Sequence, residues 1–162
     1  MRALFLTLAL AWPHSGPASA DTPLAPPADY TTTQDGVTLT ATVGPSSTRI
    51  TAPGGVDWIV PHWLRFAYAS PDGRAILALA DSGNLIGTRD PDQIVLTLYR
   101  ATDPEPLEAA LSSLMDPDLM PRTVSHFAWM QGLIWENGGW TLTLTDGGLI
   151  RIDPVSGVFT RQ

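Results

Sequence analysis

The chain of 162 residues contains no cysteine and no lysine. The absence of cysteine excludes thiol catalysis, disulfide bonds and metal sites built from thiolates. The absence of lysine excludes the phosphate-binding loop, which needs a Gly-rich run followed by Lys. The Gly-x-Ser-x-Gly turn of serine hydrolases and the dinucleotide-binding glycine fingerprint are also missing. The sequence therefore excludes several catalytic and nucleotide-binding classes before any residue is singled out.

Positive charge is scarce. Nine arginines stand against sixteen aspartates and glutamates, which gives a formal net charge of −7. The arginines are scattered singly, whereas nucleic-acid binding depends on clustered cations that displace counterions. Nucleic acid is therefore not an expected partner, and the same shortage disfavours binding to anionic membrane surfaces.

The chain has one long hydrophobic run, at its N-terminus. Arg2 precedes a mostly apolar stretch over residues 3–12, and small residues follow at positions 18–20. This pattern is typical of a cleavable signal peptide, and the run is about half of the ~20 apolar residues that a membrane span needs. We predict a signal peptide over residues 1–20, no membrane span, and export to the periplasm or the medium. The exported chain has eight arginines against sixteen acidic residues, a formal net charge of −8.

Proline and small residues dominate positions 21–29, which predicts a short extended leader. The remaining residues, 30–162, are expected to form a single β-rich domain. A chain of this length buries enough surface for one core without disulfides.

A two-residue period is the dominant signal after the leader. Hydrophobic residues alternate with threonine over 37–43 and again over 140–145, as expected for half-buried strands. Residues 75–80 are almost continuously apolar, which predicts a central strand. Ser70-Pro71-Asp72-Gly73 carries proline and glycine where a tight turn requires them.

One segment shows helical spacing instead. Thr102 and Glu105 are placed as a capping box, and apolar residues then recur at helical intervals up to Met115. Asp116-Pro117 ends the pattern, because a residue before proline avoids the helical conformation. We therefore predict one short helix within residues 102–115, covering a sheet.

The strand-and-turn units over residues 66–79 and 144–159 look like blades of a β-propeller. Together with residues 90–99 and 123–126, they make the chain similar to a group of small exported bacterial proteins of unassigned function. The resemblance supplies no catalytic residue. Closed propellers need about four or more blades, and this chain has strands for two or three. The predicted fold is therefore mainly β, an antiparallel meander that is partly propeller-like or a sandwich, with the short helix covering it.

A repeat with an offset of 64 residues aligns His62 with His126. If the repeat is structural, the two histidines are equivalent and could converge as metal ligands or as an acid and a base. The alternative is that each makes a structural hydrogen bond near the start of a strand. No third ligand at metal spacing accompanies either of them.

Acidic residues raise two further possibilities. Asp81, Asp90 and Asp92 form the richest acidic region, but their spacing does not match a helical calcium loop, and Asp also favours turns. No cofactor is expected. Glu136, flanked by Trp135 and Trp140, could pair with an aspartate in a glycosidase, although Glu136-Asn137-Gly138-Gly139 has the composition of a hairpin turn.

Aromatic side chains are the remaining candidates for a binding surface. The residues proposed for it are Trp63, Phe66, Tyr68, Trp129 and Trp135. Aromatic residues dominate interface cores as well as small β cores. Because successive strand residues point to opposite faces, some residues of 63–68 are expected to point outward. The sequence predicts a non-catalytic exported protein that binds another envelope protein, with an envelope hydrolase acting on carbohydrate as the alternative.

Overall fold

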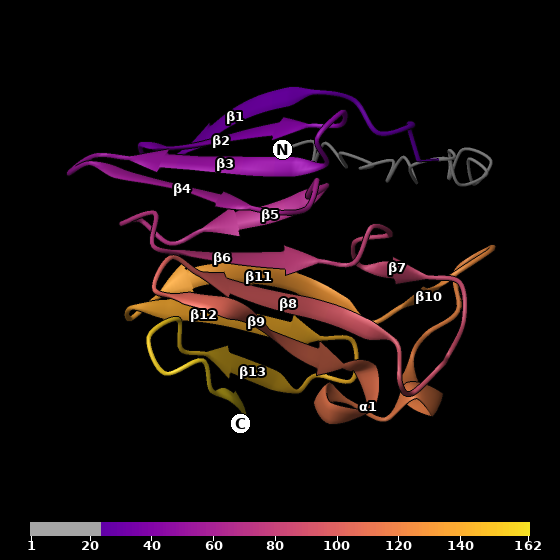
Figure 1. Ribbon diagram of the computed structural model, residues 1–162. Coiled ribbons are helices and arrows are strands. Elements are labelled where there is room, and N and C mark those ends of the chain that lie inside the picture. Colours follow the sequence, from indigo (N-terminus) through magenta and orange to yellow (C-terminus); the bar gives the residue numbers. More distant parts are fainter. Residues whose placement is uncertain (1–23) are drawn as a thin grey trace, which may run out of the picture.

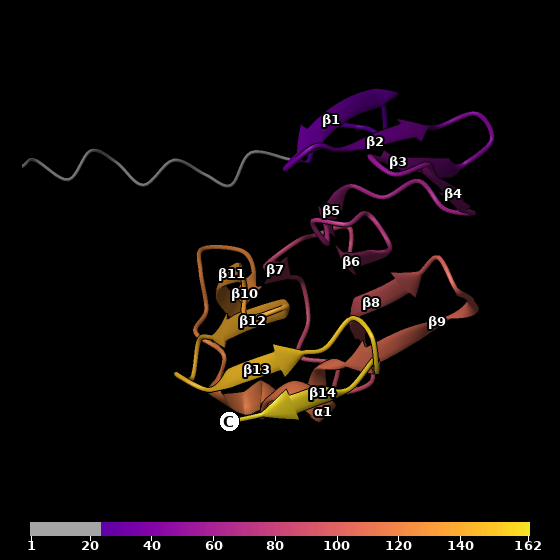
Figure 2. The same ribbon diagram turned by 90° about the vertical axis from the view of Figure 1, so that its left-hand side faces the viewer.

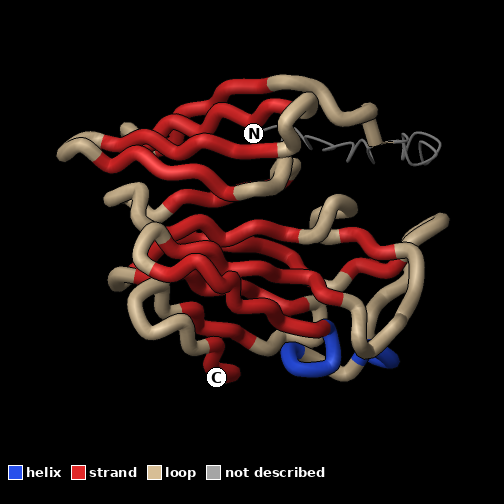
Figure 3. The backbone as a smooth tube through the Cα atoms, in the orientation of Figure 1, coloured by secondary structure: helices blue, strands red, loops and turns tan. Residues whose placement is uncertain are grey.

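The computed structural model describes residues 24–162. The signal peptide predicted over residues 1–20 and the beginning of the leader lie outside the described residues. The described part is mainly β, with three four-stranded antiparallel sheets and one two-stranded ribbon (Figures 1 and 3). The prediction of a β-rich antiparallel meander is therefore confirmed.

The first sheet contains the segment with alternating threonines. Its strands, in sheet order, are β1 (Tyr30–Gln34), β2 (Val37–Thr42), β3 (Ser47–Ala52) and β4 (Val56–Val60). On β2, Val37, Leu39 and Ala41 are fully buried, whereas the threonines between them are partly or largely exposed. The alternation therefore gives one core face and one solvent face, as the period predicts.

The middle sheet contains the apolar run. Its strands, in sheet order, are β5 (Phe66–Ala69), β6 (Ala75–Leu79), β8 (Ile94–Arg100) and β9 (Asp103–Ala110). Every residue of β6 is buried, and the strand lies between β5 and β8, which confirms the predicted central position. The predicted turn joins β5 to β6, with the Gly73 N–H donating to the Ser70 carbonyl oxygen at 2.8 Å.

The third sheet contains the second threonine-alternating segment. Its strands, in sheet order, are β11 (Met130–Glu136), β12 (Gly139–Leu144), β13 (Leu149–Ile152) and β14 (Phe159–Arg161). The turn between β11 and β12 places Asn137 and Gly138 at φ of 47° and 77°, the left-handed pair of a tight hairpin. A two-stranded ribbon, β7 (Leu85–Ile86) with β10 (Phe127–Ala128), lies beside these sheets.

The described residues contain one short α-helix, as predicted, but most of the range 102–115 predicted for it is a strand. Residues 103–110 form strand β9, and only α1 (Leu111–Leu114) is helical, followed by the 3₁₀ turn η1 (Pro117–Leu119). The Arg100–Asp103 ion pair closes a tight turn that returns the chain along β8, so Leu107 pairs with Leu98. Sheet hydrogen bonding therefore overrides the local helical spacing. No helix among residues 24–162 is long and apolar enough to cross a membrane.

The middle sheet lies between two cores. On one face, Ile76 and Ala78 pack with residues of the first sheet such as Leu39. On the other face, Leu77 packs with residues of the third sheet such as Leu142. The three meanders therefore stack face to face in chain order (Figures 1 and 2). Each has the up-and-down strand order of a propeller blade, and among the described residues the first and third sheets share no strand pairing.

Candidate binding site

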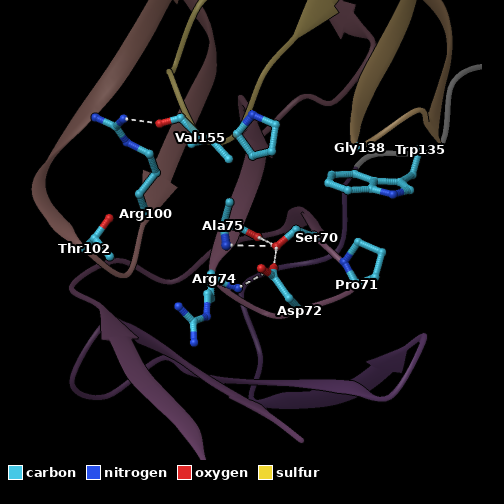
Figure 4. Close-up of a pocket in the computed structure, with 11 residues that line it drawn as sticks. Ser70, Pro71, Asp72, Arg74, Ala75, Arg100, Thr102, Trp135, Gly138 and Val155 are labelled. Carbon is cyan, nitrogen blue, oxygen red and sulfur yellow. Dashed lines mark hydrogen bonds between the residues drawn. The ribbon is translucent and has the colours of Figure 1, made fainter. Parts of the chain in front are cut away.

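Hairpin turns of the middle and third sheets meet around a cavity of about 610 Å³. Four turns supply its wall: β5–β6, β8–β9, β11–β12 and β13–β14 (Figure 4). The residues that line it are Ser70, Pro71, Asp72, Arg74, Ala75, Arg100, Thr102, Trp135, Gly138, Pro154 and Val155. The volume falls within the range of small-molecule and cofactor pockets.

The β5–β6 turn holds its own polar groups in place. Ser70 is 2% exposed, and its Oγ donates to Asp72 Oδ1 at 2.6 Å and accepts from the Ala75 N–H at 3.0 Å. The Arg74 N–H donates to the same Asp72 oxygen at 3.1 Å. The Ser70 hydroxyl therefore stabilises the turn, and no histidine is among the residues that line the cavity beside it.

Asp72 is the one carboxylate in the wall of this cavity. Burial acts to raise its pKa, but the hydrogen bonds from Ser70 and the Arg74 N–H, together with the Arg74 charge, outweigh burial and lower it. Asp72 is therefore ionised at neutral pH. Both hydrogen bonds reach Oδ1.

The two arginines of the cavity differ in their contacts. Arg100 donates to the Asp103 carboxylate at 2.5 Å and to the Val155 carbonyl oxygen at 3.2 Å, which ties the β13–β14 turn to the middle sheet. Gly157 lies against the same region, where a Cβ would overlap Leu107. The Arg74 guanidinium is exposed and makes no hydrogen bond or ion pair within residues 24–162.

An apolar wall faces these polar groups. Trp135 is half-buried, and its ring packs edge-on against Trp140 at 4.9 Å, which fixes the orientation of the indole. Pro154 completes the wall. Pro71 and Val155 also belong to the lining, and Val155 is 86% exposed (Figure 4). An apolar side chain this exposed is favourable to bury against a partner.

Two further hollows adjoin the cavity. One of about 430 Å³ shares Gly138 with it and continues along the third sheet past Arg151. The other, of about 270 Å³, shares Arg100 and Thr102 and reaches Trp58 in the first sheet. The cavity and the two hollows therefore share residues of the turns, and together their linings include residues of all three sheets.

The structure does not bring the five predicted aromatic residues onto one surface. Trp129 is completely buried, and its Nε1 donates to the Gly83 carbonyl oxygen at 2.9 Å. Phe66 and Tyr68 pack against the core between the middle and third sheets. Trp63 is half-buried and donates through Nε1 to the Ala28 carbonyl oxygen at 3.0 Å. Of the five, Trp135 lines the cavity.

Residues 63–65 alternate as expected, because Trp63 and Arg65 are partly exposed and Leu64 is buried. The following strand β5 does not have an outward face. Phe66 and Tyr68 pack against one core, whereas Ala67 and Ala69 belong to the other. Both faces of β5 are covered because the middle sheet is sandwiched. Alternation on this strand therefore separates two cores rather than core and solvent.

The two histidines lie in different surroundings. The ring of His62 is 6.2 Å from the ring of Tyr99, and His126 Nδ1 is 2.8 Å from Ser125 Oγ. No group of three or more His, Cys, Asp or Glu that could hold a metal occurs in the described part of the chain. The Asp90 side chain accepts a hydrogen bond from the Asp92 N–H at 3.0 Å. This is the turn-stabilising role that is the alternative to calcium binding for these aspartates.

Glu136 is exposed at the end of β11 and is not among the residues that line the cavity. It neighbours Trp135 on the strand and therefore points to the opposite face. The cavity has a single carboxylate, so it does not present the two facing carboxyl groups that glycoside hydrolysis requires.

Among the residues that line the cavity, the sequence pattern singled out Trp135 as a binding candidate but not Arg74, Pro154 or Val155. All three lie in or beside segments that the sequence marks as turns. Nothing in the local pattern indicates that these turns meet, because their convergence depends on how the sheets stack.

No protein-family model matches the chain, and the comparison with curated proteins returned no match. A solved structure described as the crystal structure of HIRA(644-1017) superposes with a TM-score of 0.48 at 12% sequence identity. The match covers 82% of this chain and 38% of that one.

Proposed function

We propose that this chain is an exported, non-catalytic protein that binds another envelope protein through the cavity at its hairpin turns. The observation that supports this function is the cavity itself, an open hollow with an ordered apolar wall around Trp135. Export to the periplasm or the medium rests on the sequence pattern of residues 1–20.

The contacts of the polar groups favour binding over catalysis. Ser70 and Arg100 are engaged in holding the turns together. The half-buried Trp135 and the exposed Val155 supply apolar surface of the kind that a protein interface buries. The arrangement therefore suits a partner that inserts apolar groups, and it offers no paired acid and base in the cavity.

Val155→Asp tests this function by placing a charge on the rim. We expect the mature protein to retain one envelope protein from a periplasmic extract. The variant should retain at least about tenfold less of it. Val124→Asp is the matched control, since Val124 is 68% exposed and lines none of the three hollows. Equal retention by both variants would rule out this cavity as the binding site.

The carbohydrate hydrolase remains the alternative from the sequence, and no contact at the cavity favours it. Its simplest test is turnover of envelope polysaccharide by the purified protein and by Glu136→Gln. Turnover that disappears in this variant would replace the binding role with catalysis.

A further inference from the structure

We propose that the cavity and its adjoining hollows hold an extended, uncharged segment of the partner, with a proline or another apolar side chain against Trp135. This inference rests on the proposed function and adds the chemistry of the bound segment. Three observations carry it: the apolar wall, the mixed charge of the lining and the two hollows that share turn residues with the cavity.

The apolar wall selects the side chain. Trp135 and Pro71 supply ring surfaces to the lining (Figure 4). Pro154 is a third ring-containing residue of the lining. Grooves lined by aromatic residues commonly receive proline-containing extended segments, which lose little conformational entropy on binding. The Trp135 ring is already held by Trp140, so binding does not have to order it.

The charges of the lining disfavour an ionised side chain. Arg74 is positive and Asp72 is negative, and the charge of Arg100 is paired with Asp103. A lysine or glutamate side chain entering the cavity meets attraction from one sign and repulsion from the other. It also loses hydration against the apolar wall. An uncharged side chain avoids both costs.

The same mixed charge suits a polypeptide backbone. An extended segment has N–H groups and carbonyl oxygens that are not bonded within the segment. The Arg74 guanidinium is an available donor, and Asp72 Oδ2 is an oxygen that neither of the two turn hydrogen bonds uses. The backbone can therefore satisfy both groups without bringing a net charge.

The adjoining hollows favour a segment over a single side chain. Gly138 lines both the cavity and one hollow, and Arg100 and Thr102 line both the cavity and the other hollow, so a chain that crosses these turns can reach each of them. An extended chain advances about 3.3 Å per residue, so several consecutive residues can occupy the cavity and a hollow. The expected ligand is therefore a stretch of partner chain without secondary structure of its own.

The test uses three synthetic peptides and the full exported protein labelled with ¹⁵N. The peptides are acetyl-Ala-Pro-Leu-Pro-Ala-amide and its versions with Glu or Lys in place of Leu. Binding is followed by the indole N–H signal of Trp135, assigned with the Trp135→Phe variant. We expect the Leu peptide to bind at least about fivefold more tightly than either charged peptide. Val155→Asp should weaken it, and Val124→Asp should leave it unchanged.

Equal affinity of the three peptides, preference for a charged one, or no shift with any of them would overturn the inference. A shift produced by maltotriose but by no peptide would make the site a carbohydrate site instead. If capture of an envelope protein depends on Val155 but the three peptides bind equally, only the inference about the bound segment is wrong. If capture of the envelope protein does not depend on Val155, the proposed function itself is wrong.

Discussion

Gly73 shows how one residue sets the spacing between two sheets. Its φ is 69°, in the left-handed region, and a Cβ there would lie 2.5 Å from the Ala52 Cβ of the first sheet. Its carbonyl oxygen also accepts from Trp58 Nε1 at 2.8 Å. The β5–β6 turn therefore approaches the first sheet closely only because position 73 has no side chain.

Gly73→Ala should destabilise the protein by about 2–4 kcal/mol, because a left-handed alanine and a steric overlap add together. Gly54→Ala is the matched control. Its φ is 82° but no atom lies within 4 Å of the added methyl group, so it should cost only about 1 kcal/mol. Urea denaturation measures the free energy of unfolding of both variants. Equal decreases would contradict the close approach of the β5–β6 turn to the first sheet.

Asp146 joins the turn after β12 to the end of the chain. The Gly148 N–H donates to Asp146 Oδ1 at 2.8 Å, and Arg161 donates to Oδ2 at 2.7 Å. The Gly148 hydrogen bond is the largest influence on its pKa. With the Arg161 contact, it lowers the pKa below the ordinary aspartate value against the opposing effect of desolvation.

A lowered native pKa means that the ionised carboxylate stabilises the folded state above the unfolded pKa, and that this contribution disappears as the pH falls through the native pKa. Asp146→Asn should therefore melt below the wild type at pH 7, and the difference should narrow towards pH 3. Calorimetric melting temperatures across this range provide the measurement. A difference that stays constant with pH would show that the carboxylate charge contributes nothing.

At the scale of elements, β1 contacts the unpaired edge of β5 through one side chain. Gln34 Nε2 donates to the Ala67 carbonyl oxygen at 3.0 Å, and Gln34 Oε1 accepts from the Ala69 N–H at 3.2 Å. The amide thus replaces a neighbouring strand at this edge. It satisfies two backbone groups that would otherwise lack partners.

Gln34→Ala should cost about 1–3 kcal/mol, because it leaves a part-buried donor and acceptor without partners. Thr31→Ala on the same strand is the control, and its exposed side chain should contribute within about 0.5 kcal/mol. Chemical denaturation compares the two variants. If Gln34→Ala lowers the free energy of unfolding no more than Thr31→Ala does, water replaces the amide hydrogen bonds at no cost.

The element scale also shows where sequence patterns succeed. The threonine-alternating strands, the tight turn after β5 and the β11–β12 hairpin are local features, and all were predictable. Strand β9 was not, because residues 103–110 carry a helical spacing that the pairing with β8 overrides. Local spacing is a weak preference, whereas sheet pairing satisfies the backbone along the whole strand.

At the scale of the whole molecule, the middle sheet separates two cores. Ile76 and Leu77 are adjacent on β6, yet both are completely buried, one in each core. A sheet with a solvent face would bury only one of two such neighbours. The stacking of three sheets thus accounts for the continuous apolar run of β6.

Ile76→Ala and Leu77→Ala should each cost about 2–5 kcal/mol, since each removes buried methyl groups from a packed core. On β2, Leu39→Ala should cost a similar amount, whereas Thr40→Ala should cost less than about 0.5 kcal/mol. Thermal unfolding of the four variants tests the layering. A small loss for either β6 variant would indicate that one face of the middle sheet is open.

The sequence by itself determined the β class and the positions of the main strands and turns, because alternation and turn chemistry are properties of neighbouring residues. It also placed Trp135 among the candidates for binding. Only the tertiary structure decided that Trp129 is core, that both faces of the middle sheet are covered, and that four turns meet around Arg74 and Val155. These outcomes depend on which sheets pack together, since burial and convergence are set by contacts between segments far apart in the chain.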